Sequence, residues 1–326
     1  PAASAFFSAA LFYHDAQSDA PRSLFVVSPN NQSAESLAAE CLLYLPARSI
    51  AYLPGFESIP YEYSGVSADI GLQRIRVLSR LLAGEQLLVF TSADALLRKI
   101  PDPARLRERS LTLRVDDERP PRELMAALIA MGYQREERVE GPGQFALKGS
   151  VLDLFAVNQD RPVRLDYFDD FIETMRSFDP QTQLGSDRLN SAMILPAGEV
   201  VLDGQESDAL RAAIQERRGD PARAVPVWTE PEAGGPESDS DFDSHGLSQF
   251  YHPGVEELYS LVLGTGSVLD ACAIRPRLIL PGAQVIDEAM ARIRREFHSL
   301  HQRESTQRVC LEPAELLTDF PADHKV

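Results

Sequence analysis

The sequence has few cysteines and no pattern of metal ligands. Its three cysteines, Cys41, Cys272 and Cys310, lie far apart, are odd in number and have no metal-type spacing. Such a set does not make a disulfide framework and fits buried thiols in a reducing cytoplasm. Of the scattered histidines, only His298 and His301 can share a helix face, and we interpret that face as solvated. We therefore expect no metal site.

Basic residues and long apolar runs are also scarce. The chain has 32 Lys and Arg against 49 Asp and Glu, a formal charge of −17. Affinity for DNA or RNA depends on cations that neutralise phosphates, so strong autonomous binding to nucleic acid is not expected, although a local basic patch stays possible. A basic protein partner fits this charge better.

No apolar run reaches the roughly 20 residues that span a membrane. The opening "PAASAFFSAALFYHD" has no basic leader and no clear cleavage site, so it predicts a helix rather than a signal peptide, with a processed terminus as the alternative. These features predict a cytoplasmic location without membrane contact.

Catalytic motifs are missing as well. The sequence contains no GxxxxGK[ST], no GxGxxG after a strand, no GxSxG and no HExxH. The segment "RLILPG" has the apolar run of a strand, but Pro281 and Gly282 stand where the acids of a metal-binding strand would be. We predict no catalytic residue and no cofactor.

What is present is an alternation of helix and strand. Apolar runs at "SLFVVSP", "SIAYLPG" and "QLLVFTS" alternate with helical patterns, the first near 3–14, the second near 34–44 with Ser33 as its cap, and the third ending at Gly84. This alternation predicts an α/β fold with a parallel, doubly wound sheet. We expect a first segment at 1–108, an inserted α+β module at 109–195 and a second α/β segment at 196–326. The acidic stretch 229–246 predicts a mobile, solvated loop, with an acidic docking tail as the alternative.

One strand in the inserted module has an unusual pattern. The stretch 146–183 predicts three short strands joined by turns, and side chains on the second alternate between two faces. The core face carries Val163, Leu165 and Tyr167, and the solvent face carries Arg164, Asp166 and Phe168. A phenylalanine in a charged row is either an interface anchor or a side chain packed under a loop near the turn at Asp169–Asp170.

Three stretches together resemble a known family. "YLPGFESIPYEYSGVSADIGLQRIRVLSRL", "LLVFTSADALLRKIP" and "GYQREERVEGPGQFALKGSVLDLF…PVRLDYFDDFIETMRSFDPQTQ" are similar to segments of the bacterial transcription-repair coupling factors, the Mfd family. The resemblance covers residues 1–200 well and the remainder weakly. It implies the amino-terminal region of such a factor, similar to domains 1A, 2 and 1B of the repair helicase UvrB, and thus a degenerate helicase-like, P-loop NTPase-type sheet with an inserted domain.

The resemblance also implies that nucleotide chemistry is lost. Ser4 and Ala5 stand where the lysine and the Mg²⁺-binding hydroxyl of a P-loop belong, so ATP would lack its main charge partners. Only "SGVSA" separates "IPYEY" from Asp69, which leaves no room for the damage-probing hairpin of UvrB. We expect neither ATPase activity nor damage verification.

The inserted domain of this family binds UvrA, the damage-recognition ATPase. The resemblance places Lys148, Arg164 and Phe168 on the UvrA-binding surface, with Lys148 in place of the family's arginine, a change that loses a planar hydrogen-bonding fork. Three acidic residues, Asp166, Asp170 and Glu173, are possible additions. Gly149 is expected to serve a bulge or a close backbone approach.

These observations predict a non-catalytic adaptor that binds UvrA and recruits nucleotide excision repair to a stalled RNA polymerase. The resemblance implies that the full-length family protein is an ATP-dependent DNA translocase. Its contacts with RNA polymerase and DNA would come from regions absent here, and its carboxy-terminal domain would mask the UvrA-binding module. The alternative is a UvrB-like ATPase or helicase fragment truncated at its P-loop, before Pro1. A DNA-binding module is a third interpretation, which the net charge opposes.

Overall fold

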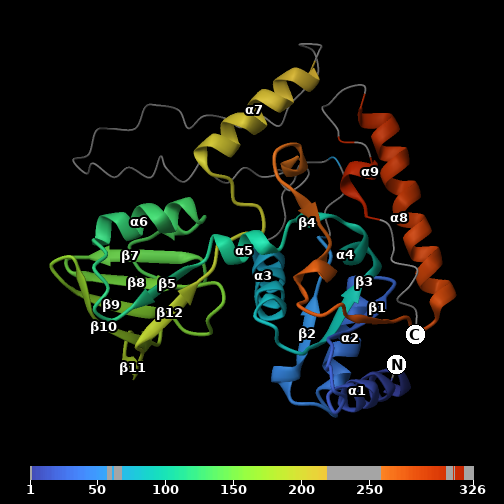
Figure 1. The fold of residues 1–326 in the computed structure, drawn as a ribbon, viewed down its shortest axis with the longest axis horizontal. Helices are drawn as coiled ribbons and strands as arrows, with labels where there is room; N and C mark the ends of the chain where they lie inside the picture. The colour runs from blue at the N-terminus through green and yellow to red at the C-terminus, as the bar shows by residue number, and fades with distance from the viewer. Residues whose placement is uncertain are drawn as a thin grey trace. The chain divides into compact units, whose positions relative to one another are not determined.

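The computed structural model describes residues 2–56, 61, 68–218, 258–305, 311 and 313–318 (Figure 1). Cys310, the acidic stretch 229–246 and the segment after "IPYEY" lie outside them. The chain divides into two compact units. Unit 1 comprises Pro1–Arg105, Ala212–Pro226 and Pro253–Val326, and unit 2 comprises Leu106–Arg211 and Val227–His252. The two boundaries that fall within described residues lie in helices α5 (Ala104–Glu108) and α7 (Gly204–Arg218).

Unit 1 contains a parallel sheet with helices along it (Figure 1). Its elements are α1 (Ala2–Asp15), β1 (Leu24–Ser28), α2 (Asn31–Cys41), η1 (Ala47–Ser49), β2 (Ile50–Leu53), α3 (Ala68–Leu82), β3 (Leu88–Ser92), α4 (Ala93–Leu97), β4 (Ile100–Pro101), η4 (Tyr259–Leu261), β13 (Thr265–Gly266), η5 (Val268–Ala271), β14 (Arg277–Ile279), α8 (Ala283–Glu304) and α9 (Pro313–Leu316). The strand order is β14-β1-β3-β2 and every pairing in it is parallel. The predicted α/β class with a parallel sheet is confirmed.

The apolar runs explain the position of these strands. All residues of β1 and β3 are buried, as expected for strands covered on both faces. Helix α3 ends where Gly84 adopts a left-handed φ of 82°, as its sequence predicted. The cap of α2 was predicted one turn too late: Asn30, not Ser33, caps the helix, and its Oδ1 accepts the Ser33 N–H at 2.9 Å.

Unit 2 contains a six-stranded sheet with helix α6 lying along it (Figure 1). Its elements are β5 (Leu111–Arg114), α6 (Pro121–Ala130), β6 (Gln134–Arg135), β7 (Gln144–Lys148), β8 (Val151–Phe155), β9 (Val163–Phe168), β10 (Phe171–Phe178), β11 (Gly185–Arg188) and β12 (Ser191–Ile194). The order is β11-β10-β9-β8-β7-β6, antiparallel except for the β6–β7 pair, and β12 pairs with β5 separately. The stretch 146–183 therefore includes residues of four strands, not the three predicted.

Two tyrosines in the core of unit 2 differ in how their hydroxyls are satisfied. The Tyr133 hydroxyl donates to the Leu195 carbonyl at 2.7 Å and accepts the Val157 N–H at 3.3 Å, and burial raises the pKa of Tyr133 above its usual range. The Tyr167 hydroxyl is buried with no hydrogen-bond partner among the described residues, and burial raises its pKa to about 12. Among the described residues, the core of unit 2 therefore has one phenol with two hydrogen bonds and one without a partner.

Within the described part of the chain, no helix is long and apolar enough to cross a membrane, and no cluster of side chains could hold a metal ion. Cys41 is buried and Cys272 is half-buried, and neither forms a disulfide.

Candidate functional site

The solvent face of β9 carries the predicted surface residues. Val163, Leu165 and Tyr167 are buried, whereas Phe168 is 71% exposed. The alternation read from the sequence is confirmed, and the alternative in which Phe168 packs under a neighbouring loop is wrong. A phenylalanine this exposed contributes little to the core of its own unit, because the hydrophobic gain depends on the apolar area that is buried.

A short hairpin presents this ring. Phe168 pairs with Phe171 across the β9–β10 hairpin, and Phe171 is itself 45% exposed. Asp169 adopts a left-handed φ of 56°, which is tolerated by Asp in tight turns. The Asp170 carbonyl accepts the Arg119 N–H at 2.8 Å, which ties the turn to the chain before α6. The two phenylalanines are thus held at a fixed hairpin end.

Strand register brings Lys148 to the same face. Lys148 pairs with Val151, Val151 pairs with Asp166, and Asp166 pairs with Thr174. Residues paired directly across strands point to the same face, so Lys148 lies on the face that carries Asp166. The exposed Lys148 ammonium has no partner among the described residues. The role predicted for Gly149 is corrected: it forms no bulge and approaches no other backbone, but its left-handed φ of 61° makes the tight β7–β8 turn.

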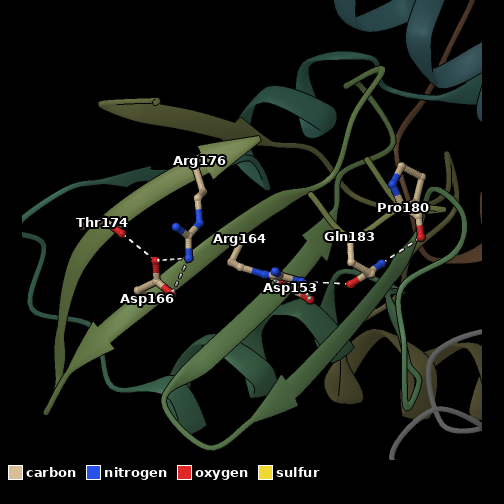
Figure 2. A network of polar contacts seen from close by, with 7 residues as sticks. All are labelled: Asp153, Arg164, Asp166, Thr174, Arg176, Pro180 and Gln183. Atoms are coloured by element: carbon tan, nitrogen blue, oxygen red, sulfur yellow. Dashed lines mark hydrogen bonds and ion pairs between the residues drawn. The ribbon is translucent and has the colours of Figure 1, made fainter. Parts of the chain in front are cut away.

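Arg164 does not stand free, as Figure 2 shows. Its Nε and Nη2 donate to the two carboxylate oxygens of Asp153 at 2.6 and 2.7 Å, and Nη2 also donates to the Gln183 amide oxygen at 3.0 Å. The guanidinium lies 4.5 Å from the centre of the Phe178 ring, and the Asp153 hydrogen bond raises the pKa of Arg164. The side chain is only 20% exposed, so the expected open arginine is in fact fixed in place.

This fixation leaves a defined set of donors. A guanidinium offers five N–H groups, and carboxylates prefer to engage two in parallel. Asp153 fills the Nε–Nη2 fork, and Gln183 takes the second proton of Nη2. Only the Nη1 protons of Arg164 lack an acceptor among the described residues. A partner therefore meets Arg164 through Nη1 alone, unless it displaces Gln183.

The possible acidic additions have different surroundings. Asp166 accepts from the Thr174 hydroxyl at 2.6 Å and pairs with the Arg176 guanidinium at 3.0 Å (Figure 2). Asp170 and Glu173 are exposed. The Asp166 carboxylate thus has its partners within the sheet, whereas the other two carboxylates face solvent.

Sequence reasoning missed Asp153, Phe178 and Gln183. Asp153 pairs in register with Arg164 on the adjacent strand, and its place in "VLDLF" between buried leucines put it on the polar face. Alternation could have found its face. Its pairing with Arg164 depends on register, which one sequence does not specify.

The predicted nucleotide-site positions lie inside a helix. Ser4 and Ala5 belong to the first turns of α1, and Ala5 is fully buried, with its carbonyl accepting the Cys41 Sγ–H at 3.5 Å. The first three residues of "RLILPG" form β14, and Gly282, with a left-handed φ, precedes α8. Neither place offers a lysine or a carboxylate to a phosphate or a metal.

The carboxyl ends of the parallel strands, where α/β sheets bind ligands, are occupied by the chain itself. The Asn31 side chain accepts the Gly55 N–H at 2.8 Å and donates to the Gly55 carbonyl at 3.2 Å. The buried Arg74 guanidinium lies 4.1 Å from the centre of the Phe56 ring and donates to the Pro54 carbonyl at 2.6 Å. We call this cluster of Asn31, Pro54, Gly55, Phe56 and Arg74 the filled edge of unit 1.

Comparison with known proteins finds relatives among the transcription-repair-coupling factors and a domain match within unit 2. Residues 111–199 match the family model described as the UvrB interaction domain. The chain is 33% identical over 199 residues to the transcription-repair-coupling factor of Myxococcus xanthus, which is 59% of this chain and 17% of that protein. It is 30% identical over 195 residues to the factor of Haemophilus influenzae (60% and 17%) and 28% over 183 residues to that of Bacillus subtilis (56% and 16%). The matched stretches thus span 16 to 17% of these three relatives. The three predicted surface residues all lie within 111–199.

Proposed function

We propose that this chain, a relative of the transcription-repair-coupling factors that carries a UvrB interaction domain, is a non-catalytic adaptor that binds UvrA. Through that contact it would direct nucleotide excision repair to a stalled RNA polymerase. The observation that carries the proposal is Phe168, 71% exposed at a fixed hairpin end in the matched domain, with Lys148 and Arg164 on the same face.

The chemistry of this face suits a protein partner. Exposed aromatic residues near arginines dominate many interfaces, because they bury a large apolar area while the guanidinium fixes direction. Burying one phenylalanine contributes about 1.5–3 kcal/mol. Along β9, Arg164 and Phe168 stand about 13 Å apart, so one partner surface can contact both.

The filled edge of unit 1 supports the non-catalytic part of the proposal. A nucleotide at the carboxyl ends of β1, β2 and β3 would have to displace Phe56, Arg74 and the Asn31–Gly55 hydrogen bonds. We propose that unit 1 is a degenerate helicase-like domain without ATPase activity. The translocase activity of the family, its contacts with RNA polymerase and DNA, and the masking of the module by a carboxy-terminal domain would belong to other regions of a longer protein.

Calorimetric titration of UvrA into this chain tests the proposal. We expect binding in the micromolar range or tighter, and a loss of about 2 kcal/mol, or roughly 30-fold, for Phe168→Ala. Met193→Ala is the matched control, because Met193 is 45% exposed on β12, outside the six-stranded sheet. Equal affinities for the wild type and Phe168→Ala, or no binding at all, would contradict the proposal.

A further inference from the structure

Three arginines stand side by side across the exposed sheet. In the antiparallel register, Arg164 on β9 pairs with Arg176 on β10, and Arg176 pairs with Arg188 on β11. Directly paired residues point to the same face, and neighbouring strands lie about 4.8 Å apart. We call Arg164, Arg176 and Arg188 the arginine row.

Placing three arginines in register does not by itself stabilise the sheet. Like charges in directly opposite positions are destabilising, and the chain as a whole is poor in basic residues, with 32 against 49 acidic ones. Asp153 compensates Arg164 and Asp166 compensates Arg176. Arg188 is exposed, and no described residue bonds to its side chain. Three aligned arginines therefore need an explanation other than packing.

The number of N–H donors without an acceptor among the described residues increases from Arg164 to Arg188. Arg164 keeps only its Nη1 protons, as described above. Arg176 contacts Asp166 through Nη2 alone, at 3.0 and 3.2 Å, so that Nε and Nη1 remain open toward any partner outside the described residues. Arg188 has no hydrogen-bond acceptor among the described residues. The outer strands β10 and β11 thus offer more hydrogen-bond capacity than the residues predicted from the sequence.

We infer that the arginine row extends the docking surface and takes a carboxylate-bearing segment of the partner protein. The inference rests on the proposed function and adds two residues, Arg176 and Arg188, and a partner chemistry to it. Charge complementarity favours this occupant, because guanidinium groups match carboxylates in pairs.

Nucleic acid fits the row less well than discrete carboxylates. Asp153 and Asp166 stand within or beside the row and would repel a continuous phosphate backbone. The net charge of −17 adds long-range repulsion. Separate carboxylates on a protein can each meet one arginine and avoid these acids.

The test uses Arg188→Glu, because Arg188 has no partner in the described structure to leave unsatisfied. Arg211→Glu is the control, since Arg211 forms an exposed ion pair with Asp208 on α7, outside the sheet. Binding of the intact chain is measured by fluorescence anisotropy or calorimetry to three probes: UvrA, a labelled oligoglutamate peptide and a labelled DNA duplex.

We expect Arg188→Glu to weaken binding to UvrA and to oligoglutamate about fivefold at low salt, with a smaller effect at high salt and little effect of Arg211→Glu. If the wild type binds oligoglutamate but not UvrA and the variant loses the peptide, the inference stands and the proposed function fails. Unchanged affinities for both in Arg188→Glu would overturn the inference. So would tight binding to duplex DNA that the variant abolishes.

Discussion

An arginine lies over a phenylalanine in both units of the chain, and the two pairs differ in what they leave open. In unit 1, Arg74 covers Phe56 at 4.1 Å and is fully buried. In unit 2, Arg164 covers Phe178 at 4.5 Å, but its side chain is 20% exposed and its Nη1 donors have no acceptor in the described part of the chain. The same contact lies buried at the filled edge in one unit and holds a partly exposed hydrogen-bond donor at the surface of a sheet in the other.

This comparison shows why the contact type alone does not identify a site. Arginine–aromatic stacking is worth about 0.5–2 kcal/mol wherever it occurs. Function depends on the donors that remain and on the exposed groups nearby. The filled edge has no exposed aromatic neighbour among its own residues, whereas Phe168 and Phe171 stand on the same sheet as Arg164.

The largest effect should come from breaking the filled edge. Arg74→Ala removes a buried side chain and leaves the Pro54 carbonyl without its hydrogen bond, so we expect unfolding free energy to fall by about 3–5 kcal/mol. Urea unfolding of the variant, beside the exposed Gln73→Ala on the same helix, measures this. A loss under about 1 kcal/mol would mean that the edge is not a structural core.

Arg164 should combine a stability effect with a binding effect. Arg164→Ala leaves the half-buried Asp153 without its ion pair, so we expect a loss of about 1–3 kcal/mol in unfolding free energy in addition to weaker UvrA binding. The double variant Asp153→Asn/Arg164→Gln should recover most of the stability and none of the affinity. A double-mutant cycle on both quantities separates the two roles. Recovered affinity in the double variant would show that Arg164 acts only within the sheet.

The smallest effect concerns two tyrosines in the core of unit 2. Tyr133→Phe removes two hydrogen bonds and should cost about 1–2 kcal/mol of unfolding free energy. Tyr167→Phe removes a hydroxyl with no described partner and should be neutral or stabilising by up to about 1 kcal/mol. Thermal unfolding of both variants ranks them. The reverse order would mean that Tyr167 has a polar partner after all.

Alternation predicted much of this architecture because it reflects local geometry. The alternation of strand and helix patterns around β1, β2 and β3 indicated a parallel sheet, and the two-residue period of β9 placed Phe168 on the open face. The cap of α2 was misplaced because Asn30 and Ser33 are both good capping residues, and only the backbone conformation at Asn30 decides between them.

The surroundings of Arg164 could not be predicted in the same way. Its contacts come from β8, from the end of β10 and from the turn at 179–183, and they depend on strand register and on the path of that turn. The arginine row has the same origin, since Arg164, Arg176 and Arg188 are 12 residues apart at each step and meet only through pairing. A single sequence indicates which face of a strand a side chain occupies, but only the strand pairing decides which side chains become its neighbours.

Hydrogen–deuterium exchange of the chain with and without UvrA tests the central proposal most directly. We predict slower exchange at the Lys148–Val151 and Phe168–Phe171 turns and along β10 and β11, with no change at residues 29–31 and 54–56 of the filled edge. Protection confined to the filled edge, with none across residues 144–188, would contradict the proposal that the chain acts through the exposed face of its antiparallel sheet.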